Sequence, residues 1–232
     1  MDPILDGLIK AFILLVTLDP EVYSIMALTL RVSGLAVMIG AVIGFPIGAT
    51  AALSEFKGKR LFVSIINTLM GLPPVVVGLL VYLLLSASGP LGPLQLLYTP
   101  NAMVIAQLII AIPIVVGVTI SAVGSVDKSI RDKALSLGAS KYQLILTIIR
   151  EARVGLITAV ILAFGAAISE VGAVMIVGGN IRWYTRVLTS AIVFETELGE
   201  FSIAIALGLI LLLLAFIINW VLTYLQWSGL RR

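Results

Sequence analysis

Long apolar runs alternate with short polar segments along the whole chain. A helix needs about 20 predominantly apolar residues to cross about 30 Å of hydrocarbon, where its backbone groups must all be satisfied internally. Runs of that length lie at Val22–Leu53, Leu61–Ser86, Ala102–Gly124, Val154–Val177 and Phe201–Leu225. The pattern therefore predicts an all-α integral membrane protein with five spans, which form one domain over residues 1–232.

The apolar stretch at the N-terminus, Ile4–Leu18, is shorter than the length needed to cross the hydrocarbon. It also carries two charges, Asp6 and Lys10, which can lie on one face of a helix. Such a segment is typical of a helix that lies in the membrane interface, and we expect a peripheral helix here rather than a sixth span. Met1–Asp19 also lacks the basic start and the small-residue cleavage site of a removable signal peptide.

Composition excludes several classes of function. The chain is 60% hydrophobic and 12% charged, whereas an ordinary soluble domain has about 25% charged residues. It has no cysteine and no histidine, which excludes disulfides, thiol nucleophiles and histidine-ligated metal sites. The basic residues make no extended patch for nucleic acid. We expect no catalytic residue, no metal site, no cofactor and no nucleic-acid partner for this chain.

The basic residues in short loops predict the orientation. Lys57, Lys59 and Arg60 follow the first span, a basic segment separates spans three and four, and Arg231–Arg232 end the chain. Five spans place all three regions on one side, and basic loops face the cytoplasm. The sequence therefore predicts a multi-pass plasma-membrane protein with its N-terminus outside and its C-terminus inside.

Small residues and prolines punctuate the spans. Small residues recur at every fourth position in Ala36–Gly48 and again in Gly155–Ala167, a spacing that allows helix backbones to approach closely, within one subunit or between two. Pro46, the Gly71–Pro74 cluster and Pro113 are predicted to interrupt their helices. Broken helices either line pathways or act as plain kinks within a bundle.

The segment Asp127–Arg153 is the one long charged stretch in the chain. Its apolar residues can share one side of two short helices, and Gly138 tolerates the positive φ that a tight turn between them requires. Such a helix pair, placed on the cytoplasmic side, favours a docking element for a soluble partner. A solvated loop held at the membrane surface is the alternative.

The same segment carries a resemblance to a known family. Asp132-Lys133-Ala134, followed by Gly138, resembles the cytoplasmic Glu-Ala-Ala…Gly motif in permease subunits of binding-protein-dependent ABC importers, with Asp132 in place of the usual Glu. The chain is most similar to the oxyanion permeases for molybdate, tungstate and sulfate, and above all to tungstate permeases. The segments that carry this likeness are Gly71–Leu79, Gly89–Gly92, Ile168–Ala173, Gly178–Asn180, Thr185–Thr189 and Glu195–Phe201.

The resemblance implies a type I importer transmembrane domain that works as a homodimer. It implies two cytoplasmic ATPase subunits, which hold the ATP and Mg²⁺, and an external binding protein that delivers the anion. The ATPases would be seated on a coupling helix within residues 125–153. The coupling residues are Asp132, Ala134, Leu135, Gly138, Ala139, Ser140 and Tyr142.

Other functions stay open at this point. A molybdate or sulfate permease of the same type is the first alternative to a tungstate permease. A secondary transporter or channel is the second, and an intramembrane enzyme is a distant third because no acid/base pair is available.

Two charges fall well inside the predicted spans. Arg31 lies about 14 Å below the outer end of span one and Glu170 about 11 Å below that of span four, at 1.5 Å per residue. A charge in the hydrocarbon must face protein or water. We therefore predict that Arg31 pairs with Glu170, as a structural clamp or as part of an outer gate. Pro73, Pro74 and Gly172 are the further gate or pathway candidates.

The outer mouth of the pathway is predicted at Asn180, Arg182 and Arg186. These arginines can attract an oxyanion or meet acidic groups on the binding protein. Alternatively they anchor the chain at the membrane interface together with Trp183 and Tyr184.

Overall fold

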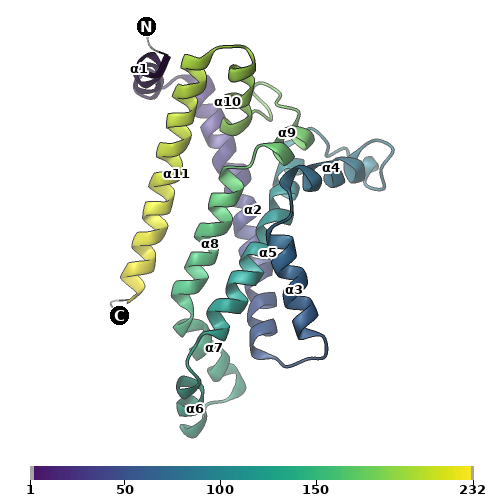
Figure 1. Cartoon of the computed structure of the whole chain (residues 1–232), viewed down its shortest axis with the longest axis vertical. Helices are drawn as coiled ribbons and strands as arrows, with labels where there is room; N and C mark the ends of the chain where they lie inside the picture. The colour runs from purple at the N-terminus through teal and green to yellow at the C-terminus, as the bar shows by residue number, and fades with distance from the viewer. Residues whose placement is uncertain (1–2, 231–232) are drawn as a thin grey trace.

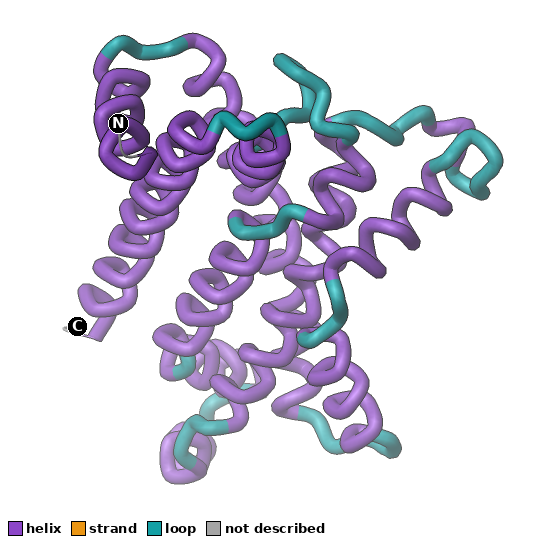
Figure 2. The backbone as a smooth tube through the Cα atoms, turned by 45° about the horizontal axis from the view of Figure 1, so that its top comes forward, coloured by secondary structure: helices purple, strands orange, loops and turns teal. Residues whose placement is uncertain are grey.

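A computed structural model describes residues 3–230 of the chain, and these residues form helices and loops without strands (Figures 1 and 2). The α-helices, with one 3₁₀ helix η1 (Gly92–Leu94), are α1 (Pro3–Val16), α2 (Pro20–Leu53), α3 (Lys59–Met70), α4 (Pro74–Leu85), α5 (Pro100–Gly124), α6 (Lys128–Ser136), α7 (Lys141–Glu151), α8 (Arg153–Ile168), α9 (Gly172–Gly178), α10 (Leu188–Glu197) and α11 (Phe201–Leu230).

Three helices are long and apolar enough to cross a membrane on their own, namely α2, α5 and α11. Two bent helix pairs, α3 with α4 at 95° and α7 with α8 at 60°, bring the number of spans to as many as five if each pair counts as one span. The all-α membrane architecture is confirmed. Span two breaks at Gly71–Pro73, where the sequence predicted an interruption, whereas the break of span four at residues 169–171 was not predicted.

The two proline predictions outside the Gly71–Pro74 cluster are wrong. Pro46 lies inside the continuous helix α2, and Pro113 lies inside α5. A proline within a helix removes one backbone N–H donor and leaves one carbonyl without its helical hydrogen bond. A membrane helix tolerates this when neighbouring groups satisfy that carbonyl. The Gly71–Pro74 cluster does end a helix, because Pro73 adopts an extended conformation (φ −59°, ψ 122°) ahead of α4.

The small-residue stripe of α2 packs against α5 within the same chain. Ala36, Gly40, Gly44 and Gly48 are all buried. A Cβ atom added at Gly44 would lie 2.7 Å from Val115 Cγ1, and one at Gly48 would lie 2.6 Å from Thr119 Cβ. The stripe on α8 is used in the same way, since a Cβ at Gly155 would lie 2.3 Å from Ala122 Cβ of α5. Both stripes therefore serve packing inside one subunit.

Helix α1 is a separate element that crosses α11 near its first turns (Figure 1). Gly7 sits against it so closely that an added Cβ would lie 2.5 Å from Ile205 Cγ2. The opposite face of α1 exposes large apolar side chains such as Leu5, Phe12 and Val16. This arrangement fits the interfacial helix that its length predicted.

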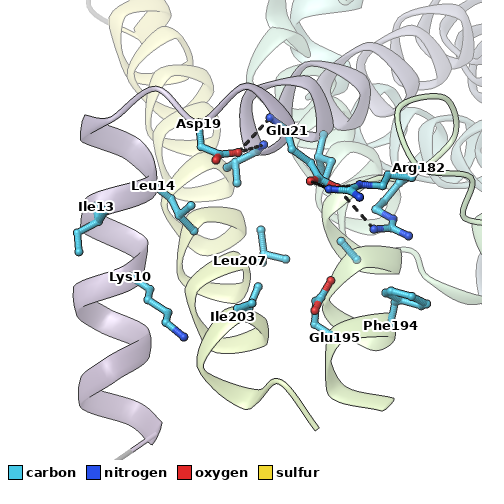
Figure 3. Close-up of a pocket in the computed structure, with 14 residues that line it drawn as sticks. Lys10, Ile13, Leu14, Asp19, Glu21, Arg182, Phe194, Glu195, Ile203 and Leu207 are labelled. Atoms are coloured by element: carbon cyan, nitrogen blue, oxygen red, sulfur yellow. Dashed lines mark hydrogen bonds and ion pairs between the residues drawn. The ribbon is translucent and has the colours of Figure 1, made fainter. Parts of the chain in front are cut away.

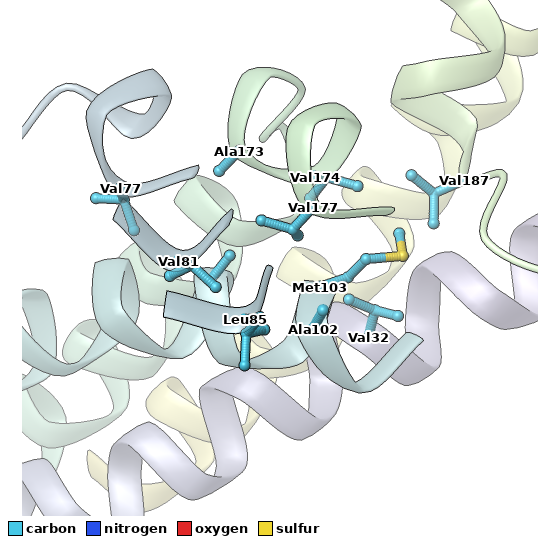
Figure 4. Packing of buried hydrophobic residues seen from close by; sticks show 11 residues of the cluster. Val32, Val77, Val81, Leu85, Ala102, Met103, Ala173, Val174, Val177 and Val187 are labelled. Carbon is cyan, nitrogen blue, oxygen red and sulfur yellow. The ribbon is translucent and has the colours of Figure 1, made fainter. Parts of the chain in front are cut away.

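A cluster of buried apolar residues joins α2, α4, α5 and α9 (Figure 4). Its members include Val32, Val81, Met103 and Val174, each at most 1% exposed. These side chains fix the half-length helices α4 and α9 to the long helices α2 and α5. The two broken spans are thus held in place by packing.

Candidate functional site

The charged segment folds as two short helices, α6 and α7, joined by a tight turn. Gly138 has φ +77°, and an added Cβ there would meet no atom within 4 Å, so conformation rather than space favours glycine. The Gly138 amide donates to Leu135 O, and the Ala139 amide donates to Ala134 O, both at 3.0 Å. The predicted helix–turn–helix with glycine at the turn is present.

Both helices begin with a side-chain cap. The Asp127 carboxylate accepts a hydrogen bond from the Ser129 amide at 2.7 Å, and this bond lowers the pKa of Asp127. Ser140 and Gln143 form a reciprocal capping box at the start of α7. Caps of this kind stabilise short helices that have little packing to hold them.

Large apolar side chains of this helix pair are exposed. Leu137 is 88% exposed and Tyr142 74% exposed, with Leu135 at 50%. The predicted coupling residues Asp132, Ala134, Ser140 and Tyr142 surround the same turn. Leu137 is not among the coupling residues that the sequence predicts. Its place directly before the turn glycine could have indicated an exposed apolar residue. The helix pair therefore presents an exposed apolar patch around its turn.

The root of this helix pair is packed into the bundle. Ile148 of α7 and Ala152 at the bend to α8 are buried against Val123 of α5. Leu53 at the end of α2 packs on the same cluster. A displacement of α6 and α7 would therefore reach α2, α5 and α8 directly.

The break between α3 and α4 lies beside the break between α8 and α9. Val75, in the first turn of α4, is so close to Gly172, the first residue of α9, that a Cβ added at Gly172 would lie 2.7 Å from Val75 Cγ2. The predicted pathway residues Pro73, Pro74 and Gly172 are thus brought together. The backbone at such breaks needs protein or water partners in place of the missing helical bonds.

The predicted pair of Arg31 with Glu170 is not formed. Glu170 is 7% exposed, and its Oε1 accepts a hydrogen bond of 2.8 Å from the Ala173 amide, which caps the first turn of α9. Its backbone oxygen accepts a bond from Thr189 Oγ1 at 2.9 Å. Arg31 is exposed on α2 and forms no salt bridge within residues 3–230. Helix capping, rather than a distant cation, accounts for the buried carboxylate.

The loop between α9 and α10 is held by polar side chains. Asn180 has φ +50°, and its Oδ1 accepts from Ser190 Oγ at 2.9 Å. Thr185 Oγ1 donates to Gly178 O at 2.6 Å and accepts from the Ile181 amide. The loop is therefore built by specific hydrogen bonds.

The two arginines of this loop, Arg182 and Arg186, both pair with Glu21. The sequence did not predict this shared partner. Arg182 donates from Nε and Nη2 to Glu21 at 2.7 and 2.5 Å, and this interaction raises the pKa of Arg182 (Figure 3). Arg186 Nη1 lies 3.7 Å from Glu21 Oε1, and its guanidinium stacks 4.6 Å from the Phe194 ring centroid. These residues line a cavity of about 620 Å³ between α1, α2, α10 and α11. Their charge is partly neutralised before any ligand arrives.

Comparisons with known proteins identify the family of this chain. Residues 44–227 match the family described as binding-protein-dependent transport system inner membrane component. The chain belongs to this family. The match includes the helix pair α6–α7 and both broken spans, so the family covers every candidate region except the N-terminal part of the chain.

Two relatives and one solved structure give the scale of the likeness. The chain is 46% identical to the tungstate uptake system permease protein TupB of Peptoclostridium acidaminophilum, over 97% of this chain and 99% of that one. It is 48% identical to a probable anion ABC transporter permease protein of Haloferax volcanii, over 84% and 87%. The crystal structure of an amino acid ABC transporter with histidines superposes with a TM-score of 0.63 at 21% identity, covering 95% and 98%.

Proposed function

We propose that this chain is the permease subunit of an ATP-driven oxyanion importer, with tungstate as its cargo, and that it works as a homodimer. The observation that carries the proposal is the exposed apolar patch of Leu135, Leu137 and Tyr142 around the turn between α6 and α7, in a chain of this family. The similarity to a tungstate permease over nearly the full chain supports the choice of cargo.

A cytoplasmic ATPase dimer would seat on the turn between α6 and α7. Closure of the ATPases on ATP would move this turn, and the buried root at Ile148 and Ala152 would pass the movement to α8. The outer end of α8 leads into the break at residues 169–171, next to α4. ATP hydrolysis takes place in the partner, while this chain supplies the path and the mechanical link.

The positions of the basic segments support the proposed orientation. The α2–α3 connection, with Lys57 and Lys59, and the helix pair α6–α7 lie at the end opposite to the N-terminus (Figure 1). Basic loops face the cytoplasm. We place the N-terminus outside, where the external binding protein would dock near the loop between α9 and α10.

Reconstitution tests the proposal directly. The chain would be combined in proteoliposomes with its cognate ATPase and binding protein, and uptake of tungstate, molybdate and sulfate would be measured with and without ATP. We expect ATP-dependent tungstate uptake that requires the binding protein. ATP-independent transport would overturn the importer and favour a secondary transporter or channel, whereas preference for sulfate would overturn the cargo.

A charged substitution at the turn tests the docking surface. Leu137→Asp would put a carboxylate into the apolar contact and should lower stimulated ATPase activity by roughly tenfold or more, as loss of a central interface residue does. Ser129→Asp is the matched control, because it adds the same charge to the first turn of α6, where a carboxylate is favourable. Equal activity of both variants would contradict docking at the turn.

A further inference from the structure

Helix α3 has an exposed polar face in the middle of a bent membrane span. Its interior side, with Ile66 and Met70, packs on α5, where a Cβ at Gly117 would lie 2.4 Å from Met70 Sδ. Three polar residues and one glycine recur along α3 up to its C-cap, namely Arg60, Ser64, Asn67 and Gly71. The last three follow Arg60 by four, seven and eleven positions, so all four lie on one face of the helix. All four are exposed.

The same helix carries a separate apolar face at the same depths. Leu61, Ile65 and Leu69 are also exposed, with Leu61 66% and Ile65 48% accessible. These residues suit contact with lipid chains. Besides the face packed on α5, α3 therefore has one apolar face suited to lipid and one polar face suited to water.

The polar side chains of this face have spare hydrogen-bonding capacity. Within residues 3–230 the amide of Asn67 and the hydroxyl of Ser64 form no hydrogen bond, and Thr68 Oγ1 donates only to Ser64 O at 2.9 Å. In hydrocarbon an unpaired amide is unfavourable, so such a face turns toward water or another polar surface. At 1.5 Å per residue Asn67 lies about 12 Å from Lys59 along the axis of α3, in the first half of the bent span.

The face also leads to the two breaks. Gly71 is the last residue before the elbow into α4, and the following turn of α4 touches Gly172 at the second break. Ser169 at that break is exposed. At the other end the face reaches Arg60, which forms no salt bridge within the described part of the chain. A polar stripe therefore runs along α3 from its basic start at Arg60 to the elbow at Gly71.

We propose that Ser64, Asn67 and Thr68 line the translocation path and hand the oxyanion from the helix breaks toward Arg60. This inference rests on the proposed import function and names the residues that would contact the cargo. Hydroxyl and amide donors hydrogen-bond an oxyanion without the full charge of an arginine, and weak successive sites allow release. The polar stripe lies on the surface of one chain, so a second copy would close it.

Cysteine accessibility tests the path, because the natural chain has no cysteine. Single variants Ser64→Cys and Asn67→Cys are compared with the matched controls Ile65→Cys and Leu69→Cys in proteoliposomes of the full transporter. An impermeant sulfonated thiol reagent should label the first pair roughly tenfold faster, because the reactive thiolate forms in water. Equal labelling of both faces would overturn the path.

Transport by the labelled variants gives the second readout. Modification of Asn67→Cys should block tungstate uptake, while modification of Leu69→Cys should leave it unchanged. Labelling of Asn67→Cys without a block would overturn contact with the cargo. If unmodified wild-type transporter moved no oxyanion at all, the proposed function would fail, and the labelling rates would still decide whether this face borders water.

Discussion

At the scale of single residues, Glu170 shows how a buried carboxylate is stabilised without a cation. Its bond to the Ala173 amide satisfies the first turn of α9. Loss of a side-chain cap costs about 0.5–2 kcal/mol, so Glu170→Ala should lower the stability of the detergent-solubilised protein by that amount, measured by thermal unfolding. Glu170→Gln, which keeps an acceptor oxygen, should lose less.

The absence of an Arg31–Glu170 pair gives a distinct expectation. The double variant Arg31→Glu with Glu170→Arg should be no more stable than the poorer of its single variants, because no salt bridge is exchanged. A double-mutant cycle in thermal unfolding checks this. Recovery of stability in the double variant would show that the two side chains do interact.

Glu21 is the second residue whose role depends on its partners. It holds Arg182, which is 62% exposed, and Arg186, which is 11% exposed. Glu21→Ala should destabilise by about 1–3 kcal/mol because the enclosed Arg186 charge loses its counterion. Arg182→Ala serves as the comparison and should cost less, since exposed ion pairs contribute little. A larger loss for Arg182→Ala in thermal unfolding would reverse this account.

At the scale of elements, the turn at Gly138 joins α6 to α7, and an added Cβ there would meet no atom of the bundle within 4 Å. Gly138→Val forces a β-branched residue to φ +77°, a conformation that costs L-residues about 1–2 kcal/mol. We expect stimulated ATPase activity to fall while the thermal stability of the spans stays unchanged. Gly138→Asn is the control, because asparagine tolerates this conformation. Equal activity of both variants would argue against the turn as the docking point.

The contact between α2 and α5 offers a second comparison on one helix. Gly44→Ala places a Cβ 2.7 Å from Val115 Cγ1, whereas Gly34→Ala meets no atom within 4 Å. The first variant should lose about 1–3 kcal/mol, typical of overpacking, and the second should lose little. Thermal unfolding of the two proteins in the same detergent measures the difference. Equal stability of the two variants would mean that α2 and α5 can move apart at no cost to make room for the added methyl group.

At the scale of the whole molecule, the orientation can be tested from either side of the membrane. Leu198, in the turn between α10 and α11, is 60% exposed, and Leu137, in the turn between α6 and α7, is 88% exposed. In intact cells an impermeant maleimide should label Leu198→Cys, and it should label Leu137→Cys only after permeabilisation. The reverse pattern would invert the proposed topology.

The sequence by itself determined the membrane class, the five apolar runs, the peripheral N-terminal helix and the helix–turn–helix at Gly138. Each depends on local physics: hydrophobic length, a cap such as Ser140, or a glycine that accepts positive φ. These signals lie within a few residues of one another. They are therefore readable without knowing what packs against them.

The tertiary structure alone decided which partners the polar and small residues have. Glu170 bonds to a nearby amide rather than to Arg31, and Arg182 reaches back across the chain to Glu21. The small-residue stripes pack within one subunit, and the packing of α3 on α5 through Ile66 and Met70 decides that its polar face stays exposed. Such choices depend on distances between segments far apart in sequence, which hydrophobic periodicity does not encode.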